Sequence, residues 1–452
     1  MPTTVNPATE AEVASYSYAS DADLEDALGR AASAFESHRQ TTVGERAAGM
    51  RRLAELLEDG ADAHGALMTS EMGKPLDQAV AEAKKCAWAC RFYAEHAERF
   101  LEDEPRETTA SRSWVAYQPL GPVLAVMPWN FPFWQVLRFA APTVMAGGVG
   151  ILKHAEPVLG CGERIAELFL EAGFPPGVFQ HVVLEVDRVQ DVIEDDRIAA
   201  VTLTGSEGAG RAVGGQAGAA LKPCVLELGG TDAFVVLQDA DLEAAVETGV
   251  QARVQNNGQS CIAAKRFIVE RPVADAFTER FVERMRALEV GDPTGDVDLG
   301  PLVSAEARGA LQDQVGRALE GGATLLCGGA IPDGTGFYYP PTVLGNVEAG
   351  SVAFREELFG PVAALTVADD LEDAVRLAND TRFGLGGSVW TRDLEVGERV
   401  ARAVRSGAVF VNAMTQSHPA LPFGGIGDSG VGRELGREGI RAFTNAKTIW
   451  VE

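Results

Sequence analysis

The stretch Gln255-Asn256-Asn257-Gly258-Gln259-Ser260-Cys261-Ile262-Ala263-Ala264-Lys265-Arg266 joins two different patterns. A helical pattern that starts at Asp241 runs into it and stops at Asn257-Gly258, a pair that suits the left-handed end of a helix. The apolar run Phe267-Ile268-Val269, typical of a buried strand, follows it. We therefore predict a loop that carries one thiol, Cys261, among small and polar neighbours. Because a free cysteine usually packs as a small hydrophobe, the loop alone leaves a structural role open beside a reactive one.

The composition indicates a globular protein without a membrane span. The chain has 452 residues, 46% of them hydrophobic, which is enough for two or three domains. No apolar run reaches the ~18 residues that a membrane span needs. The N-terminus lacks the basic and apolar blocks of a signal peptide. We expect a cytoplasmic protein with no membrane partner.

The net charge of −26 comes from 65 acidic against 39 basic residues. Nucleic-acid-binding proteins present basic patches, so no nucleic-acid partner is expected. We predict a halophilic protein, because salt screens the repulsion between surface carboxylates; a merely acidic protein is the alternative. Neither a disulfide framework nor a metal site is expected, since the six cysteines form no CxxC pair and have no histidine at zinc spacing. They are Cys86, Cys90, Cys161, Cys224, Cys261 and Cys327.

Short apolar strands alternate with helices in two blocks. The first hundred residues show helical spacing, as in 21–38, and strands are then predicted at 123–127, 150–153, 179–183, 198–204 and 225–228. The alternation starts again after Gly229-Gly230, with strands at 233–236, 267–269, 323–327, 362–367, 386–390 and 408–411. This pattern predicts an α/β fold with two Rossmann-like open parallel sheets. Two outlying strands, 113–117 and 447–451, are predicted to pair as a small β element for oligomerisation.

Three further motifs carry side chains that suit chemistry on a ligand. The turn from Thr204 to Gly210 follows a strand and opens a helix, as phosphate-binding turns do, although it is not GxGxxG and a plain tight turn explains it equally. Glu227 lies in an apolar strand, where burial raises a carboxyl pKa toward that of a general base; an exposed edge strand is the alternative. Asn130 ends another strand and can donate to an oxyanion or simply occupy a turn.

Together, these motifs and the Cys261 loop resemble the NAD(P)-dependent aldehyde dehydrogenase superfamily. The family-like order is Trp129-Asn130, Lys153, Gly205-Ser206, Glu227-Leu228-Gly229-Gly230, Cys261 and Glu357, with Pro422-Phe423-Gly424-Gly425-Ile426 near the C-terminus. The resemblance implies an NAD-binding domain of residues 1–102 and 121–228, a catalytic domain of residues 229–428, and oligomerisation strands in 103–120 and 429–452. It also implies a homodimer or homotetramer.

The resemblance assigns roles to the matching residues. Cys261 is the expected nucleophile, Asn130 the expected oxyanion donor, and Glu227 the base for hydrolysis of a thioester. The residues that match cofactor contacts are Trp129, Lys153, Glu156, Gly205, Ser206, Leu228, Glu357 and Phe359. Glu156 is expected to favour NAD over NADP, because a carboxylate there would repel a 2′-phosphate.

Three segments, 136–142, 151–155 and 221–224, are most similar to the shorter, NAD-preferring succinate-semialdehyde dehydrogenases. Arg138 matches an arginine that pairs with the far carboxylate of the substrate, and Ser417 matches a second polar contact. A solvent-facing helix arginine is the alternative for Arg138. Gln255 stands where other such enzymes have a second arginine. Ala263 stands where some have the second cysteine of a redox switch, so no switch is expected.

The expected reaction is therefore the NAD-dependent oxidation of succinate semialdehyde to succinate. One alternative is an aldehyde dehydrogenase for glycolaldehyde, lactaldehyde or an aliphatic aldehyde. Another is a catalytically inactive NAD-binding structural protein of the same fold. The presence of Cys261, Glu227 and Asn130 disfavours this last alternative.

Overall fold

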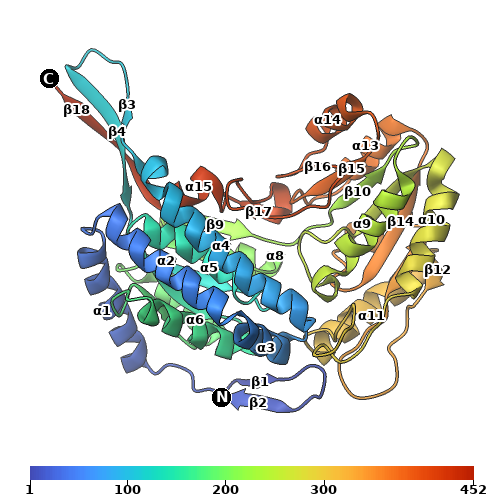
Figure 1. The fold of residues 1–452 in the computed structure, drawn as a ribbon, viewed down its shortest axis with the longest axis horizontal. Helices are drawn as coiled ribbons and strands as arrows, with labels where there is room; N and C mark the ends of the chain where they lie inside the picture. The colour runs from blue at the N-terminus through green and yellow to red at the C-terminus, as the bar shows by residue number, and fades with distance from the viewer.

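The computed structural model describes all 452 residues, which form two lobes around two sheets (Figure 1). The six-stranded sheet has the order β17-β9-β8-β5-β6-β7, and the seven-stranded sheet the order β12-β13-β14-β11-β10-β15-β16. Neighbouring strands are parallel except at one edge of each sheet, where β17 and β12 run antiparallel to their partners. The predicted α/β fold with two open, mainly parallel sheets is confirmed. No helix is both long and apolar enough to cross a membrane.

The first lobe is organised around the six-stranded sheet and its covering helices. Its strands are β5 (Pro122–Met127), β6 (Val149–His154), β7 (Phe179–His181), β8 (Ala200–Thr204), β9 (Cys224–Glu227) and β17 (Gly430–Val431). Its helices are α1 (Asp21–His38), α2 (Val43–Asp59), α3 (Ala61–Met72), α4 (Leu76–Leu101), α5 (Trp134–Met145), α6 (Leu159–Glu171), α7 (Val189–Glu194), α8 (Glu207–Ala219) and α15 (Gly436–Arg441). Every residue of α5 is buried. Its polar side chains, Gln135 and Arg138, must therefore find partners inside the protein.

The second lobe is organised around the seven-stranded sheet. Its strands are β10 (Ala233–Val236), β11 (Arg266–Glu270), β12 (Thr324–Cys327), β13 (Thr342–Gly345), β14 (Val362–Ala368), β15 (Gly387–Trp390) and β16 (Phe410–Val411). Its helices are α9 (Leu242–Val254), α10 (Arg271–Arg286), α11 (Ala305–Glu320), α12 (Val352–Arg355), α13 (Leu371–Asn379) and α14 (Leu394–Ala403). Phe234 and Val235, neighbours on β10, belong to two different hydrophobic clusters. Side chains alternate between the faces of a strand, so helices cover both faces of this sheet.

An arm of three strands projects from the first lobe (Figure 1). It consists of β3 (Glu104–Pro105), β4 (Arg112–Pro119) and β18 (Thr444–Val451), and β18 pairs antiparallel with β4 along its whole length. The expected strand pair thus forms within one chain, and its role in oligomerisation stays a prediction. Residues 429–452 do not all belong to the arm, because β17 pairs with β9 in the six-stranded sheet.

The N-terminus also differs from the helical expectation for the first hundred residues. It begins with a hairpin of β1 (Thr3–Val5) and β2 (Glu12–Ser15). These two short segments, TTV and EVAS, are mostly polar or small, so they show no apolar run that would indicate a strand. By contrast, α1 has the predicted bounds, since Ser20 and Asp23 form a capping box at its start.

The loop after α9 turns sharply toward the first lobe. Asn256, Asn257 and Gly258 have φ angles of 56°, 59° and 72°, all left-handed. A Cβ at Gly258 would lie 2.4 Å from the carbonyl carbon of Gly360, so only glycine fits there. The backbone N–H of Asn256 donates to Oε1 of Gln78 on α4, at 2.8 Å. This turn brings the segment with Cys261 against the first lobe.

Candidate active site

Two buried side chains of the second lobe hold the Cys261 loop. The amide Nδ2 of Asn257 donates to the carbonyls of Gly73 and Pro301, at 2.9 and 2.8 Å, and its Oδ1 accepts the N–H of Gly300. Lys265 Nζ donates to the carbonyls of Ser260 and Cys261, at 2.8 and 2.6 Å. These bonds fix the backbone on both sides of the thiol.

Cys261 has the surroundings of a reactive thiol more than of a packing one. It is half-buried, whereas Cys86, Cys90 and Cys161 are fully buried. Its backbone N–H donates to no protein acceptor and is free to bind an oxyanion. Burial raises the pKa of the Cys261 thiol to about 12, and Lys265 and Arg138 act in the opposite direction. These two cations offset only part of the cost of burying the thiolate.

Asn130 lies directly against this loop, as the sequence predicted. Its Nδ2 donates to the carbonyl of Gln259 at 2.9 Å, and its Oδ1 accepts from Nε2 of Gln135 at 3.0 Å. Its own carbonyl accepts from Nδ2 of Asn256 at 2.8 Å. An amide has two N–H groups, so one remains for a ligand beside Cys261.

Glu227, the last residue of β9, is buried without a hydrogen-bond partner on either carboxyl oxygen. Burial raises its pKa well above the usual carboxyl range, and the nearby Glu434 raises it further. The alternative of an exposed edge residue is wrong, because β17 covers β9. A Cβ at Gly424 would lie 2.5 Å from Glu227 Oε1, so the motif 422–426 closes onto this carboxyl group. An unpaired buried carboxyl group with a raised pKa suits a general base.

The glycine-rich turn has the geometry of a phosphate-binding helix start. Ser206 caps α8, and its hydroxyl accepts the N–H of Ala209 at 3.3 Å. The N–H of Gly205 donates to the carbonyl of Glu227 at 2.9 Å, and Leu228 packs against Gly210. A Cβ on Gly208 would contact nothing within 4 Å, which leaves room beside the helix start. The turn therefore fits the pyrophosphate of a dinucleotide.

The other residues predicted for the cofactor lie in two groups. Lys153, buried at the end of β6, forms no ion pair, whereas Glu156 is exposed and accepts the hydroxyl of Tyr18 at 2.6 Å. Trp129 and Phe359 meet edge to face with ring centres 5.7 Å apart. Glu357 pairs with Lys265 at 2.9 Å and accepts the N–H of Gly230. Lys153, a cation without an ion-pair partner, suits a phosphorylated ribose. The pair of Trp129 and Phe359 suits a flat aromatic ring.

The residues predicted for the substrate line a cavity of about 240 Å³ that also includes Cys261. Arg138 is only 2% exposed, so the alternative of a solvent-facing arginine is wrong. Its guanidinium forms an ion pair with the buried Glu434 and donates to the hydroxyl of Thr204 at 3.3 Å. Ser417 accepts from Lys85 Nζ at 2.8 Å. The cavity thus brings Arg138 and Ser417 together with the thiol.

Sequence reasoning missed Lys85 and Glu434. Lys85 follows Lys84 on a long helix, where a pair of lysines is typical of a solvated surface. Glu434 lies in an irregular segment after β17, where no periodicity indicates which side chains are buried. The closeness of Glu434 to Arg138 follows from the tertiary fold alone.

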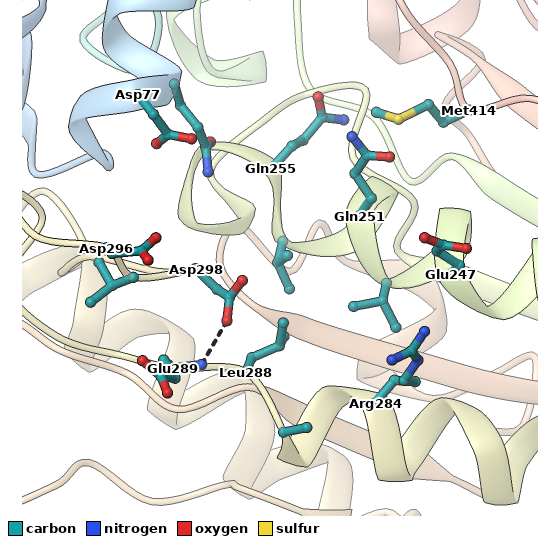
Figure 2. A pocket seen from close by; sticks show the side chains of 15 residues that line it. Asp77, Glu247, Gln251, Gln255, Arg284, Leu288, Glu289, Asp296, Asp298 and Met414 are labelled. Carbon is teal, nitrogen blue, oxygen red and sulfur yellow. Dashed lines mark hydrogen bonds between the residues drawn. The ribbon is translucent and has the colours of Figure 1, made fainter.

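A wider hollow of about 850 Å³ adjoins this cavity (Figure 2). The two share the side chains of Gln78 and Gln255. Figure 2 shows Asp77, Asp296 and Asp298 around one part of the hollow, facing Gln251 and Gln255. None of the residues predicted for catalysis or for the cofactor lines it. The smaller cavity, and not this hollow, contains Cys261.

Comparisons with known proteins identify the family of the chain. The family model described as "Aldehyde dehydrogenase family" matches residues 2–449. A probable succinate-semialdehyde dehydrogenase [NADP(+)] of Synechocystis sp. is 50% identical over 449 residues, 99% of each chain. Succinate-semialdehyde dehydrogenase [NADP(+)] 1 of Mycobacterium tuberculosis is 50% identical over 452 residues, again 99% of each. The crystal structure of succinic semialdehyde dehydrogenase from Streptococcus pyogenes, in complex with NADP+, has a TM-score of 0.98 at 36% identity and covers 100% of both chains.

These comparisons correct one prediction, the preference for NAD. Both relatives are named for NADP(+), and the similar solved structure holds NADP+. The prediction relied on the charge of Glu156 alone. In the structure that carboxylate accepts a hydrogen bond from the hydroxyl of Tyr18, and this bond raises the pKa of Tyr18 to about 12. Lys153 meanwhile offers a positive charge without an ion-pair partner, so the single carboxylate was not a sufficient basis for the prediction.

Proposed function

The chain belongs to the aldehyde dehydrogenase family, and on this premise we propose that it oxidises succinate semialdehyde to succinate with NADP+ as the acceptor. The observation that carries the proposal is the composition of the Cys261 cavity. One small space is lined by a thiol, two basic side chains and a hydroxyl, from Cys261, Arg138, Lys85 and Ser417. A short aldehyde with a carboxylate at its other end can present its aldehyde carbon to the thiol and its carboxylate to the basic side chains.

In the first half of the reaction, the Cys261 thiolate attacks the aldehyde carbon. The carbonyl oxygen becomes an oxyanion, for which the N–H of Cys261 and the second N–H of Asn130 are the available donors. The bound NADP+ supplies a hydride acceptor, and the product on the enzyme is a thioester at Cys261. Lys265 keeps the loop in place through its bonds to Ser260 and Cys261.

In the second half, water hydrolyses the thioester. Glu227 takes the proton of this water, and its raised pKa makes it a stronger base than an ordinary carboxylate. Neither carboxyl oxygen of Glu227 accepts a hydrogen bond from the protein, so both are available to the water. The acid, succinate, then leaves the cavity.

For the acceptor, Ser206 and the start of α8 would hold the pyrophosphate, Lys153 the phosphorylated ribose, and Trp129 with Phe359 would line the nicotinamide end. The printed names of the relatives support NADP+ over NAD+.

Steady-state kinetics with purified protein test the proposal. We would measure kcat/KM for succinate semialdehyde, butanal, glycolaldehyde and hexanal, each with NADP+ and with NAD+. The expected result is a preference of about tenfold or more for succinate semialdehyde, since a charge-assisted contact is made only by this substrate. An equal or higher kcat/KM for any uncharged aldehyde would refute succinate semialdehyde as the substrate. A higher kcat/KM with NAD+ would refute the acceptor.

A further inference from the structure

The two peptide groups that flank Cys261 share one buried cation. Lys265 Nζ donates to the carbonyl of Ser260 at 2.8 Å and to that of Cys261 at 2.6 Å. The Lys265 side chain is 0% exposed, and it does not line the cavity that contains the thiol. Both carbonyls therefore point into the protein and away from the cavity.

The N–H groups of the same two peptides must point the other way. The chain has no cis peptide bond, and in a trans peptide group the C=O and the N–H lie on opposite sides. The N–H of Cys261 is opposite the Ser260 carbonyl, and the N–H of Ile262 is opposite the Cys261 carbonyl. Neither N–H forms a hydrogen bond within the protein. Because Ser260, Cys261 and Ile262 all line the cavity, both N–H groups are directed toward the space beside the thiol.

All three N–H donors of the Lys265 ammonium group have partners. Besides the two carbonyls, Nζ binds Oε1 of Glu357 at 2.9 Å. A cation bound to a carbonyl oxygen polarises the whole peptide group and makes its N–H a stronger donor, because linked hydrogen bonds strengthen one another at low dielectric. Lys265 therefore acts on the N–H groups of Cys261 and Ile262 through the peptide bonds, without contact with the ligand.

We propose that Lys265 is a positioning residue for the oxyanion, which aligns and polarises the N–H groups of Cys261 and Ile262 as a pair of donors beside the amide of Asn130. In this step the sulfur of Cys261 forms a bond to the carbonyl carbon, and the electron pair of the C=O π bond moves to the oxygen. The negative charge develops on that oxygen, where fixed donors act most strongly. The inference rests on the proposed function in one respect, that Cys261 attacks a carbonyl carbon.

Two reactions of the thiolate separate this role from a direct effect on the thiol. The direct effect exists, since the Lys265 charge acts to lower the pKa of Cys261 while burial raises it. Iodoacetamide alkylates the thiolate by displacement of iodide and forms no oxyanion. The ester para-nitrophenyl acetate acylates it through a tetrahedral oxyanion, from which para-nitrophenolate leaves. A change in the thiolate fraction alters both rates equally, so the ratio of acylation to alkylation reports on the oxyanion.

The test measures both reactions in the full-length protein without a dinucleotide. Acylation is followed by the burst phase of para-nitrophenolate release, and alkylation by mass spectrometry of the peptide that contains Cys261. We expect Lys265→Met to lower the ratio of the two rates about tenfold, since removal of a direct oxyanion donor costs about 100-fold or more. Lys265→Arg keeps the charge and should restore part of the ratio.

Lys222→Met is the matched control, because Lys222 also donates from Nζ to a backbone carbonyl, that of Asp195, at 2.5 Å. Its ratio should equal that of the wild type. Lys265→Gln keeps an N–H donor without the charge and should also lower the ratio, which provides the same comparison if Lys265→Met does not fold.

An unchanged ratio in the neutral Lys265 variants would overturn the proposal, even if both rates fell, because Lys265 would then act on the thiol alone. A loss in Lys265→Arg as large as that in Lys265→Met would also overturn it. If alkylation of Cys261 leaves the NADP+-dependent oxidation intact, the proposed function itself fails. If alkylation abolishes the oxidation and the ratio stays unchanged, only the Lys265 inference fails.

Discussion

Two side chains that hold the Cys261 loop, Asn257 and Lys265, differ from two first-lobe side chains, Glu227 and Lys85, in how fully their polar atoms are paired. Asn257 and Lys265, which fix the loop, use their side chains fully: Asn257 makes three buried hydrogen bonds, and Lys265 makes two and an ion pair. Glu227 has no hydrogen-bond partner, and Lys85 has no anion.

The difference separates residues that hold the structure from residues that meet the ligand. A buried polar group with all its partners stabilises the fold, and its loss leaves those partners unpaired. A buried group without partners destabilises the fold, so its presence indicates a function. Substitutions in the two sets should therefore affect different measurements.

The largest expected effect is on catalysis, at the thiol where the two regions meet. Cys261→Ala should lower kcat by about 1,000-fold or more, because no other nucleophile replaces the sulfur. The melting temperature should stay close to that of the wild type. Cys327→Ala is the matched control, since Cys327 is also half-buried but lies on β12. Comparable loss of activity in both variants would show that Cys261 acts through packing.

The second-largest loss of kcat is expected for Glu227→Gln, and its melting temperature should also stay close to that of the wild type. We expect kcat to fall about 100-fold, as for loss of a general base. In the wild type, the base acts only when ionised, so its raised pKa should place the rising limb of the kcat–pH profile above the usual carboxyl range. The variant should lose this limb. A pH profile that keeps its limb in Glu227→Gln would assign the limb to another group.

Asn257→Ala should show the opposite behaviour, with stability as the main effect. It leaves the carbonyls of Gly73 and Pro301 and the N–H of Gly300 without their partner, which should lower the free energy of unfolding by about 2 kcal/mol. Asn346→Ala is the control, because Asn346 is also left-handed but exposed. The midpoints of urea unfolding compare the two. Equal shifts would mean that the left-handed backbone, and not the buried bonds, sets the cost.

The smallest expected effect concerns Glu156, which lies outside both sets. Glu156→Gln removes one exposed negative charge near Lys153 and should raise kcat/KM for NADP+ about fivefold, since the 2′-phosphate is then repelled less. The value for NAD+ should change little. An equal rise with both dinucleotides would show that the carboxylate does not act on the phosphate.

Residues with a strong local signal were well predicted from the sequence. The helix 21–38 has both apolar spacing and a capping box, and the parallel strands are short apolar runs between turns. Cys261, Glu227 and Asn130 were chosen through motifs in a family-like order, and the structure places Asn130 against the loop and Glu227 in a buried, unpaired position.

Features that depend on distant parts of the chain could not be predicted in this way. The partner of Arg138 is Glu434, and Glu156 bonds Tyr18; in both pairs the two residues are far apart in the sequence. The charge of a residue is visible in the sequence, but whether that charge is already neutralised is not. The preference for NAD was predicted wrongly because the charge of Glu156 was considered without that of Lys153, which has no ion-pair partner in the fold. Lys85 was missed because only the fold shows that it lines the cavity.

The most direct test of the account is a single-turnover experiment on Glu227→Gln. The variant is mixed with succinate semialdehyde and NADP+, NADPH is followed optically, and the protein is then digested and analysed by mass spectrometry. The account predicts a burst of one NADPH per active site and a succinyl group on the peptide with Cys261, because the thioester forms but is not hydrolysed. NADPH production with unmodified Cys261 would contradict it.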